Sequence, residues 1–317
     1  MSEFQLSRRA MLLAAPALAI RHAAFAADPV LRAGDQKGGT QSVMKAAGVL
    51  DNLPYRLEWS QFPAAAPVLE ALNAEAVDLG FAGDAPTTFG LAAGLRGRII
   101  APVRTTAGGT AIMVGKDSPI RAVADLKGRS IAVNRGSIGH LLVLAVAAQQ
   151  KWSPSDYTVV NLLPAEAKTA LSAGSVDAWC SWGVYVAQAK LVDQARVIVD
   201  GRNGLMTGLS FLTATDLAIA TYRPQIVDFT HRLAIARRWA LSHPADYARV
   251  LATEIGVTEP VARLTIDTDA TKPVAIDDGV IADEQKTADL YLAAKIIRTR
   301  VDARKAFDAS FNETLAG

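Results

Sequence analysis

Short apolar strands alternate with amphipathic helices twice along this chain of 317 residues, and this order limits the possible folds more than any other feature. The hydrophobic periodicity predicts a strand–helix alternation that begins and ends with a strand between residues 30 and 103, and a second one from residue 111 to residue 199. Alternation of this kind is typical of a mostly parallel sheet with helices on both faces. We therefore expect two α/β units, followed by helices from Asp216 almost to the end.

Three predicted strand-to-helix turns, at residues 36–40, 83–86 and 134–140, are rich in glycine and short polar side chains. Ligands of open α/β sheets bind beyond the carboxyl ends of the strands, and a helix N-terminus offers free amide groups to an anion. Because the turns belong to both units, we expect them to face each other across a cleft. Asp35 and Asp84 are expected to cap helices, and near Asp84 the neighbouring amides, not the carboxylate, are expected to face the ligand.

A second candidate feature is the segment 177–185, where Trp179, Trp182 and Tyr185 lie close together in a chain that is only 6% aromatic. Aromatic rings at the end of a strand can line an apolar slot that has one solvated edge. Trp179 fits a core position equally well, whereas Trp182 follows the predicted strand and is expected to face the cleft. The segment thus predicts an aromatic wall beside the anion-binding turns.

Residues 1–26 have the three parts of an export signal: the arginine pair Arg8-Arg9, an apolar run to Ile20, and Ala24-Phe25-Ala26 before a cleavage site. The arginine pair suits twin-arginine export, and a Sec signal can have a similar form. Cleavage after Ala26 would remove three of the 33 basic residues and one of the 31 acidic residues, which leaves 30 of each. This exported chain is expected in the periplasm, and without a basic stripe it is not expected to bind nucleic acid.

The residues that usually carry catalysis or metal binding form no recognisable motif in this sequence. The single cysteine, Cys180, excludes an internal disulfide and a cysteine-rich metal site, and the histidines lack metal-ligand spacing. Nucleophile-elbow, dinucleotide and phosphate-loop motifs are absent, so no cofactor is expected. His140 could donate a hydrogen bond to a ligand, although a lone helix histidine more often has a structural role. Arg237 and Arg238 are expected on a solvated helix face.

Four stretches resemble the periplasmic substrate-binding proteins of ABC importers for aliphatic sulfonates, within the nitrate-, sulfonate- and taurine-binding group. They are QKGG (36–39), LEALNAEAVDLGFAGDAP (69–86), KDSPIRAVADLKGRSIAVNRGS (116–137) and SVDAWCSW (175–182). The resemblance implies a two-lobed α/β fold of the type II periplasmic-binding-protein kind, in which each lobe is a mixed, mostly parallel sheet flanked by helices and the C-terminal tail is helical. It also implies that residues 27–112 and 208–317 form one lobe and residues 113–207 the other.

The resemblance implies a binding protein, not an enzyme, that closes by a hinge on a small organic anion such as an alkanesulfonate. It implies a monomer that delivers this ligand to the membrane permease subunits of an importer. Where the family often has Trp-Asp-Pro-Tyr, this chain has Trp182-Gly183-Val184-Tyr185, and the missing acid disfavours an amine-bearing ligand such as taurine. The residues expected to bind the ligand are Gln36, Gly83, Asp84, Ala85, Ser137, His140, Trp179 and Trp182.

Other functions stay open at this point. Taurine, nitrate and sulfate esters are alternative ligands for a binding protein. An enzyme on the same fold, such as one that makes a pyrimidine precursor, is an alternative of another class, but it would need a reactive cluster of histidine or cysteine. A sensor domain is a third alternative, which the lack of a fused signalling module disfavours.

Overall fold

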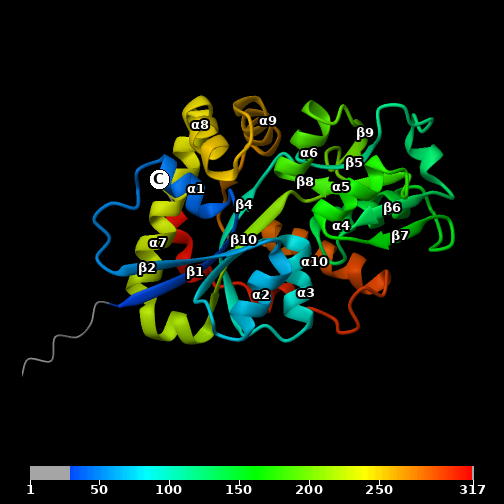
Figure 1. Ribbon diagram of the computed structural model, residues 1–317. Helices are drawn as coiled ribbons and strands as arrows, with labels where there is room; N and C mark the ends of the chain where they lie inside the picture. The colour runs from blue at the N-terminus through cyan, green and yellow to red at the C-terminus, as the bar shows by residue number, and fades with distance from the viewer. Residues whose placement is uncertain (1–28, 316–317) are drawn as a thin grey trace, which may run out of the picture.

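The computed structural model describes residues 29–315, so the predicted export signal at residues 1–26 lies outside the described part of the chain. Two separate mixed sheets, each flanked by helices, form two lobes that Figure 1 shows side by side. This architecture confirms the expected α/β fold with two lobes. Within residues 29–315, no helix has both the length and the apolar character needed to cross a membrane.

The sheet of lobe 1 has the strand order β11-β4-β10-β3-β1-β2. Its strands are β1 (Val30–Gln36), β2 (Arg56–Phe62), β3 (Leu79–Gly83), β4 (Gly97–Arg104), β10 (Leu209–Thr215) and β11 (Lys272–Pro273). The connecting helices are α1 (Thr40–Ala46), α2 (Ala65–Asn73) and α3 (Asp84–Ala92). β1 pairs in parallel with β2 and β3, whereas β10 lies antiparallel between β3 and β4.

The central strand β3 is short and buried because glycine lets a helix pack directly on it. A Cβ atom on Gly80 would lie 2.6 Å from Cδ1 of Leu72 and 2.7 Å from Cγ1 of Val68, both on α2. Real Cβ atoms do not approach so closely, so any larger residue would push the helix away from the sheet. This packing fixes the height at which β3 ends and α3 begins.

The sheet of lobe 2 has the order β7-β6-β8-β5-β9. β6 pairs in parallel with β7 and β8, and β5 is antiparallel to β8 and β9. The strands are β5 (Thr110–Val114), β6 (Ser130–Val133), β7 (Thr158–Asn161), β8 (Ala178–Trp182) and β9 (Arg196–Asp200). A short 3₁₀ helix, η1 (Val123–Leu126), precedes β6, and the α-helices are α4 (Ile138–Gln149), α5 (Pro164–Ser172) and α6 (Gly183–Leu191).

The chain crosses between the sheets at two connections, residues 105–109 and 201–208. Thr110 at the start of β5 already pairs with Trp182 of lobe 2. The expected boundary between residues 112 and 113 therefore falls inside a strand, and we propose to place it before Thr110. The return boundary near residue 208 fits the start of β10 at Leu209.

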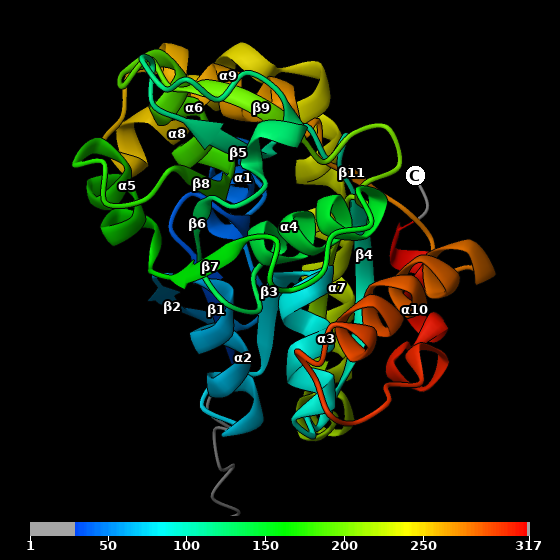
Figure 2. The same ribbon diagram turned by 90° about the vertical axis from the view of Figure 1, so that its right-hand side faces the viewer.

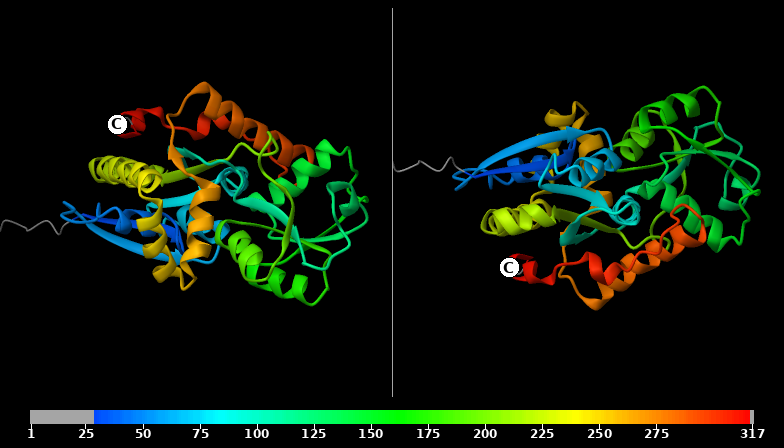
Figure 3. Two further views of the ribbon diagram at one scale, coloured as in Figure 1. Left: turned by 90° about the horizontal axis from the view of Figure 1, so that it is seen from above. Right: turned by 90° about the horizontal axis from the view of Figure 1, so that it is seen from below.

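The C-terminal third is helical, as expected, and it contacts both lobes. Its helices are α7 (Asp216–Ser242), α8 (Pro244–Ile255), α9 (Glu259–Asp269) and α10 (Asp278–Ala293), followed by the 3₁₀ helices η2 (Ala303–Ala306) and η3 (Ala309–Leu315). α7 buries Ile226, Phe229 and Leu233 against the core of lobe 1. α9 contacts α6 of lobe 2, and α10 contacts both α3 and α4 (Figures 2 and 3). These helices therefore hold the two lobes against each other.

Two buried carboxyl groups lie where α3 meets α10. Glu284 is fully buried; its Oε1 accepts a hydrogen bond from the Thr88 hydroxyl at 2.5 Å, and its Oε2 has no partner among the described residues. Burial, together with the nearby Asp84, raises the pKa of Glu284 well above its usual 4.5. The folded protein therefore keeps a proton on Glu284 to a higher pH than the unfolded chain does.

A Glu284→Gln variant is expected to gain stability relative to the wild type as the pH rises. The folded wild type must bind a proton on Glu284 that the unfolded chain loses above its usual pKa of 4.5. Its free energy of unfolding therefore falls by about 1.4 kcal/mol for each pH unit between 4.5 and the folded pKa of Glu284. Urea unfolding of both proteins at pH 5, 6 and 7.5 measures the difference, and Glu70→Gln on the exposed face of α2 serves as the control. If the difference in unfolding free energy between the wild type and Glu284→Gln did not change with pH, folded Glu284 would be ionised over this range.

Candidate functional site

A cavity of about 560 Å³ lies between the two lobes. The ends of β1, β3 and β8, the turns at residues 37–39 and 134–137, and the first turns of α2, α3, α4 and α6 contribute to its lining, together with β10 and helices α7, α8 and α9. Residues from all three predicted turns are among them. The sequence thus identified the right edge of each sheet, and the tertiary fold brings these edges together.

Five of the predicted ligand-binding residues line this cavity: Gln36, Gly83, Asp84, Ser137 and Trp182. Their contact with a ligand stays a prediction. Gly83 has a packing role as well, because a Cβ atom there would lie 2.5 Å from Cγ2 of Ile138 in lobe 2. The glycine therefore makes room for the facing lobe, in addition to any ligand.

Two of the other predicted residues, Ala85 and His140, are buried outside the cavity lining. Ala85 packs in a core cluster with Leu141 and Tyr291. Nδ1 of His140 accepts a hydrogen bond from the Gly136 amide at 3.2 Å, and burial lowers the pKa of His140 to about 4. The imidazole is therefore neutral at pH 7 and stabilises the turn before α4, which is the structural role that the sequence left open.

The two tryptophans of β8 have different positions, although they are only three positions apart in sequence. Trp179 is 2% exposed and packs in the lobe 2 core with Val176 and Val186, so it is not available to contact a ligand in this structure. Trp182 lies at the end of the strand and lines the cavity. Successive residues of a strand point to opposite faces, so an odd spacing separates the two rings.

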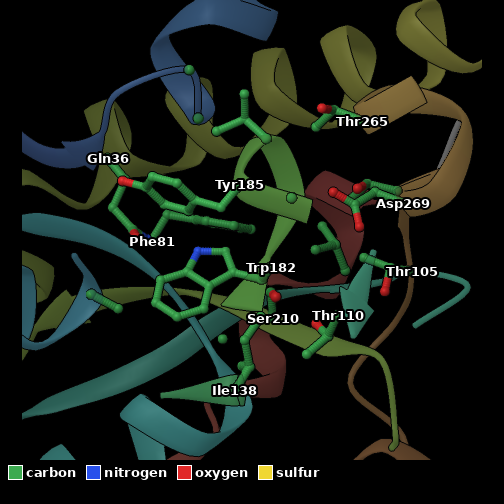
Figure 4. Close-up of a pocket in the computed structure, with 18 of the residues that line it drawn as sticks. Gln36, Phe81, Thr105, Thr110, Ile138, Trp182, Tyr185, Ser210, Thr265 and Asp269 are labelled. Atoms are coloured by element: carbon green, nitrogen blue, oxygen red, sulfur yellow. The ribbon is translucent and has the colours of Figure 1, made fainter. Parts of the chain in front are cut away.

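The aromatic wall of the cavity is formed by Phe81, Trp182 and Tyr185 (Figure 4). The rings of Trp182 and Tyr185 meet edge to face, with centroids 6.0 Å apart and an interplanar angle of 85°. Phe81 comes from β3 in lobe 1, so the wall has contributions from both lobes. Such a surface suits an apolar ligand segment with a polar group at its edge.

Two helix N-termini of lobe 1, those of α1 and α3, are already occupied by acidic side chains, whereas the first turn of α2, which also lines the cavity, has none. Oδ2 of Asp35 accepts a hydrogen bond from the Gln41 amide in the first turn of α1 at 2.8 Å, as the capping prediction expected. Asp84 is the first residue of α3, so the N-cap position belongs to Gly83, one residue earlier than expected. The Asp84 carboxylate accepts from the Ala85 amide at 2.7 Å. These acidic groups make the starts of α1 and α3 poor places for an anion.

The two lobe 2 helices that line the cavity with their first turns, α4 and α6, carry no such charge. Neither α4 nor α6 has an acidic residue in its first turn, and no side chain caps α6. Ile138 of α4 and residues 183–185 of α6 line the cavity. The positive ends of two helices therefore point at the same space without a carboxylate to neutralise them.

Arg237 lines the cavity, and its expected position on a solvated helix face is wrong. It is only 8% exposed and reaches the cavity from α7, with its guanidinium 5.1 Å from the centre of the Phe81 ring. Its position four residues after Leu233 and eight after Phe229 puts it on the buried face of the helix, and this periodicity was the signal to use.

Two carboxylates lie near Arg237, and both titrate close to neutral pH. Burial raises the pKa of Asp35 to about 6, and it raises the pKa of Asp269, at the end of α9, to about 6 as well. The positive charge of Arg237 lowers both values, so it opposes the effect of burial. The lobe 1 side of the cavity therefore holds a cluster of unexposed charged groups, while the lobe 2 side consists of helix ends, aromatic rings and the exposed Arg135.

The region that carries the cavity matches a known family. Residues 60–246 match the family described as NMT1/THI5 like. The chain is also 33% identical over 292 residues to a protein of Escherichia coli (strain K12) whose name describes it as an aliphatic sulfonates-binding protein, with 89% of this chain and 90% of that protein covered. The chain belongs to the NMT1/THI5-like family.

Solved structures with the NMT1/THI5-like architecture include binding proteins and an enzyme. The alkanesulfonate-binding protein SsuA from Xanthomonas axonopodis pv. citri, bound to MOPS, is 32% identical, has a TM-score of 0.83, and aligns over 89% of this chain and 99% of its own. The desulfurization enzyme DSZB aligns over 90% and 98% of the two chains with a TM-score of 0.66, but its 17% identity shows a common fold alone. The cavity residues, not the fold, must therefore indicate the function.

Proposed function

We propose that this NMT1/THI5-like protein is the extracytoplasmic solute-binding component of an ABC importer, and that its ligand is an aliphatic sulfonate. The observation that carries the proposal is the pairing of two helix ends that lack acidic residues, α4 and α6, with an aromatic wall in one cavity between the lobes. A sulfonate needs donors for its oxygens and an apolar surface for its tail. The names of the similar proteins from Escherichia coli and Xanthomonas support the same ligand class.

In this proposal the amide groups at the starts of α4 and α6 hold the sulfonate oxygens. Neutral donors and helix dipoles bind an oxyanion without a buried counter-charge, which leaves the ligand free to be released. Trp182 and Tyr185 contact the carbon chain. Because the cavity is lined by both lobes, closure about the connections at residues 105–109 and 201–208 would bury the ligand.

We propose binding without turnover. The only cysteine, Cys180, is 1% exposed in the lobe 2 core, and burial raises the pKa of its thiol, so it is a poor nucleophile. His140 stabilises a turn and does not line the cavity. The protein is further proposed to act in the periplasm as a monomer. It would deliver its ligand to membrane permease subunits, which would bind the closed conformation.

The proposed function is tested by isothermal titration of the mature protein with alkanesulfonates, taurine, nitrate and a sulfate ester. Micromolar binding of an alkanesulfonate, recovered unchanged afterwards, is the expected result. If none of these compounds bound at micromolar concentration, the sulfonate proposal would fail. If the ligand were converted during the titration, the binding-protein proposal would fail instead.

The position of the sulfonate is tested at Val184 in the first turn of α6, which lines the cavity. A Val184→Asp variant adds a negative charge where the oxyanion is proposed to lie, and affinity for butane-1-sulfonate should fall by about tenfold or more. Val184→Asn is the neutral control of the same shape and should bind with nearly wild-type affinity. Equal losses in both variants would place the sulfonate elsewhere, since the charge would then make no difference.

The role of the aromatic wall is tested with Trp182→Ala and two ligands, methanesulfonate and octane-1-sulfonate. Loss of the ring removes apolar contact from the long tail, so affinity for the long ligand should fall by about tenfold, while the short ligand changes little. Trp179→Phe, in the core, is the control and should leave the ratio of the two affinities unchanged. Equal weakening of both ligands by Trp182→Ala would show that the ring does not contact the tail.

A further inference from the structure

The start of α4 in lobe 2 is in close contact with lobe 1 at residues 136–138. A Cβ atom on Gly83, at the end of β3, would lie 2.5 Å from Cγ2 of Ile138. A Cβ atom on Gly136 would lie 3.6 Å from the ring of Phe89, which belongs to α3. The helix end that is proposed to hold the sulfonate therefore packs directly against two elements of the other lobe.

A third contact with the same turn comes from Tyr291 in α10. The side chain is fully buried, and its hydroxyl donates a hydrogen bond to the backbone carbonyl of Ser137 at 3.1 Å. Burial raises the pKa of Tyr291 well above its usual 10, so the hydroxyl keeps its proton and can donate. The Ser137 carbonyl also accepts from the Leu141 amide at 3.0 Å, so it would still have a partner if the tyrosine hydroxyl were removed.

Helix α10 is attached to lobe 1 by side chains that precede Tyr291. The hydroxyl of Thr287 donates to Oδ2 of Asp84 in α3 at 3.2 Å. Oδ2 of Asp283 accepts from Arg104 of β4 at 2.8 Å. Because α10 is fixed to lobe 1 in this way, the hydrogen bond of Tyr291 connects the two lobes.

The turn that Tyr291 contacts is held together by its own hydrogen bonds. Nδ1 of His140 accepts from the Gly136 amide at 3.2 Å, and the Ser137 hydroxyl accepts from the His140 amide at 3.2 Å. The rings of His140 and Tyr291 also meet, with centroids 6.3 Å apart. A contact at Ser137 therefore positions the whole turn and the first amides of α4.

We infer that Tyr291 is a positioning residue for ligand binding: its hydroxyl holds the start of α4 against lobe 1 while the lobes are closed, and this slows release of the ligand. Tyr291 is not among the residues that line the cavity, so it acts without touching the ligand. An opening motion that moves α4 away from α10 must break its bond to Ser137. The inference rests on the proposed function, which places the sulfonate at this helix end.

The test removes only the hydroxyl group, in a Tyr291→Phe variant that keeps the buried ring. Stopped-flow measurements with butane-1-sulfonate should show a dissociation rate about two- to tenfold above the wild type, the range that loss of one buried hydrogen bond gives. The association rate constant should stay within about twofold, because encounter with the open protein does not involve this bond.

Tyr55→Phe is the matched control. The hydroxyl of Tyr55 donates to Asp228 at 3.1 Å, but both residues belong to the body of lobe 1, so this bond does not connect the lobes. The control variant also loses one tyrosine hydrogen bond, and it should release butane-1-sulfonate at the wild-type rate. An effect of lost stability alone would appear in both variants.

A second measurement needs no ligand. Hydrogen–deuterium exchange of the ligand-free protein reports local opening, and Tyr291→Phe should speed exchange of the amides at residues 136–141 by about two- to tenfold. Exchange in β6 and in the helices of lobe 1 should stay at the wild-type rate. Tyr55→Phe should leave residues 136–141 unchanged.

Several results would overturn the inference. One is a dissociation rate or a local exchange rate that Tyr291→Phe leaves unchanged. Another is an equal effect of both phenylalanine variants, which would show lost stability, and a third is a change confined to the association rate. If no sulfonate bound the wild type, the proposed function would fail, while the exchange rates would still show whether Tyr291 holds the turn.

Discussion

The buried carboxyl group of Asp84 joins the segments on which the cavity depends. It begins α3 at the end of the central strand, and it accepts hydrogen bonds from Thr207 in the returning connection between the lobes and from Thr287 of α10. A buried carboxyl group is tolerated only when such bonds are made. The bonds therefore hold the end of β3, the connection and the C-terminal helix in fixed positions at one side of the cavity.

The same local geometry gives opposite electrostatic results in the two lobes. In lobe 1 the strand-to-helix turns are closed by Asp35 and Asp84, whose carboxylates offset the positive helix ends. In lobe 2 the helices α4 and α6 begin without an acid, and Ser137 caps α4 with a neutral hydroxyl. The starts of α4 and α6 on one side of the cavity therefore lack acidic residues, whereas Asp35, Asp84 and Asp269 lie in the lining of the other side with Arg237.

Local sequence patterns were good predictors of the elements and of their ends. The alternation of strands and helices gave both sheets, and residues from all three predicted turns line the cavity, because the carboxyl ends of parallel strands share an edge. The same reasoning placed Trp182 at the cleft but left open whether Trp179 is a core residue and whether His140 has a structural role. Those outcomes depend on which side of an element its neighbours cover, and only the packed structure contains that information.

Sequence alone was sufficient for the α/β class and for the helix-capping role of Asp35, because each depends on residues a few positions apart. Tertiary structure was needed for the burial of Arg237 and for the arrival of Asp269 in the cavity. The physical reason is distance along the chain: Asp35, Trp182, Arg237 and Asp269 line the cavity together, and their charges and rings act on one another only after folding.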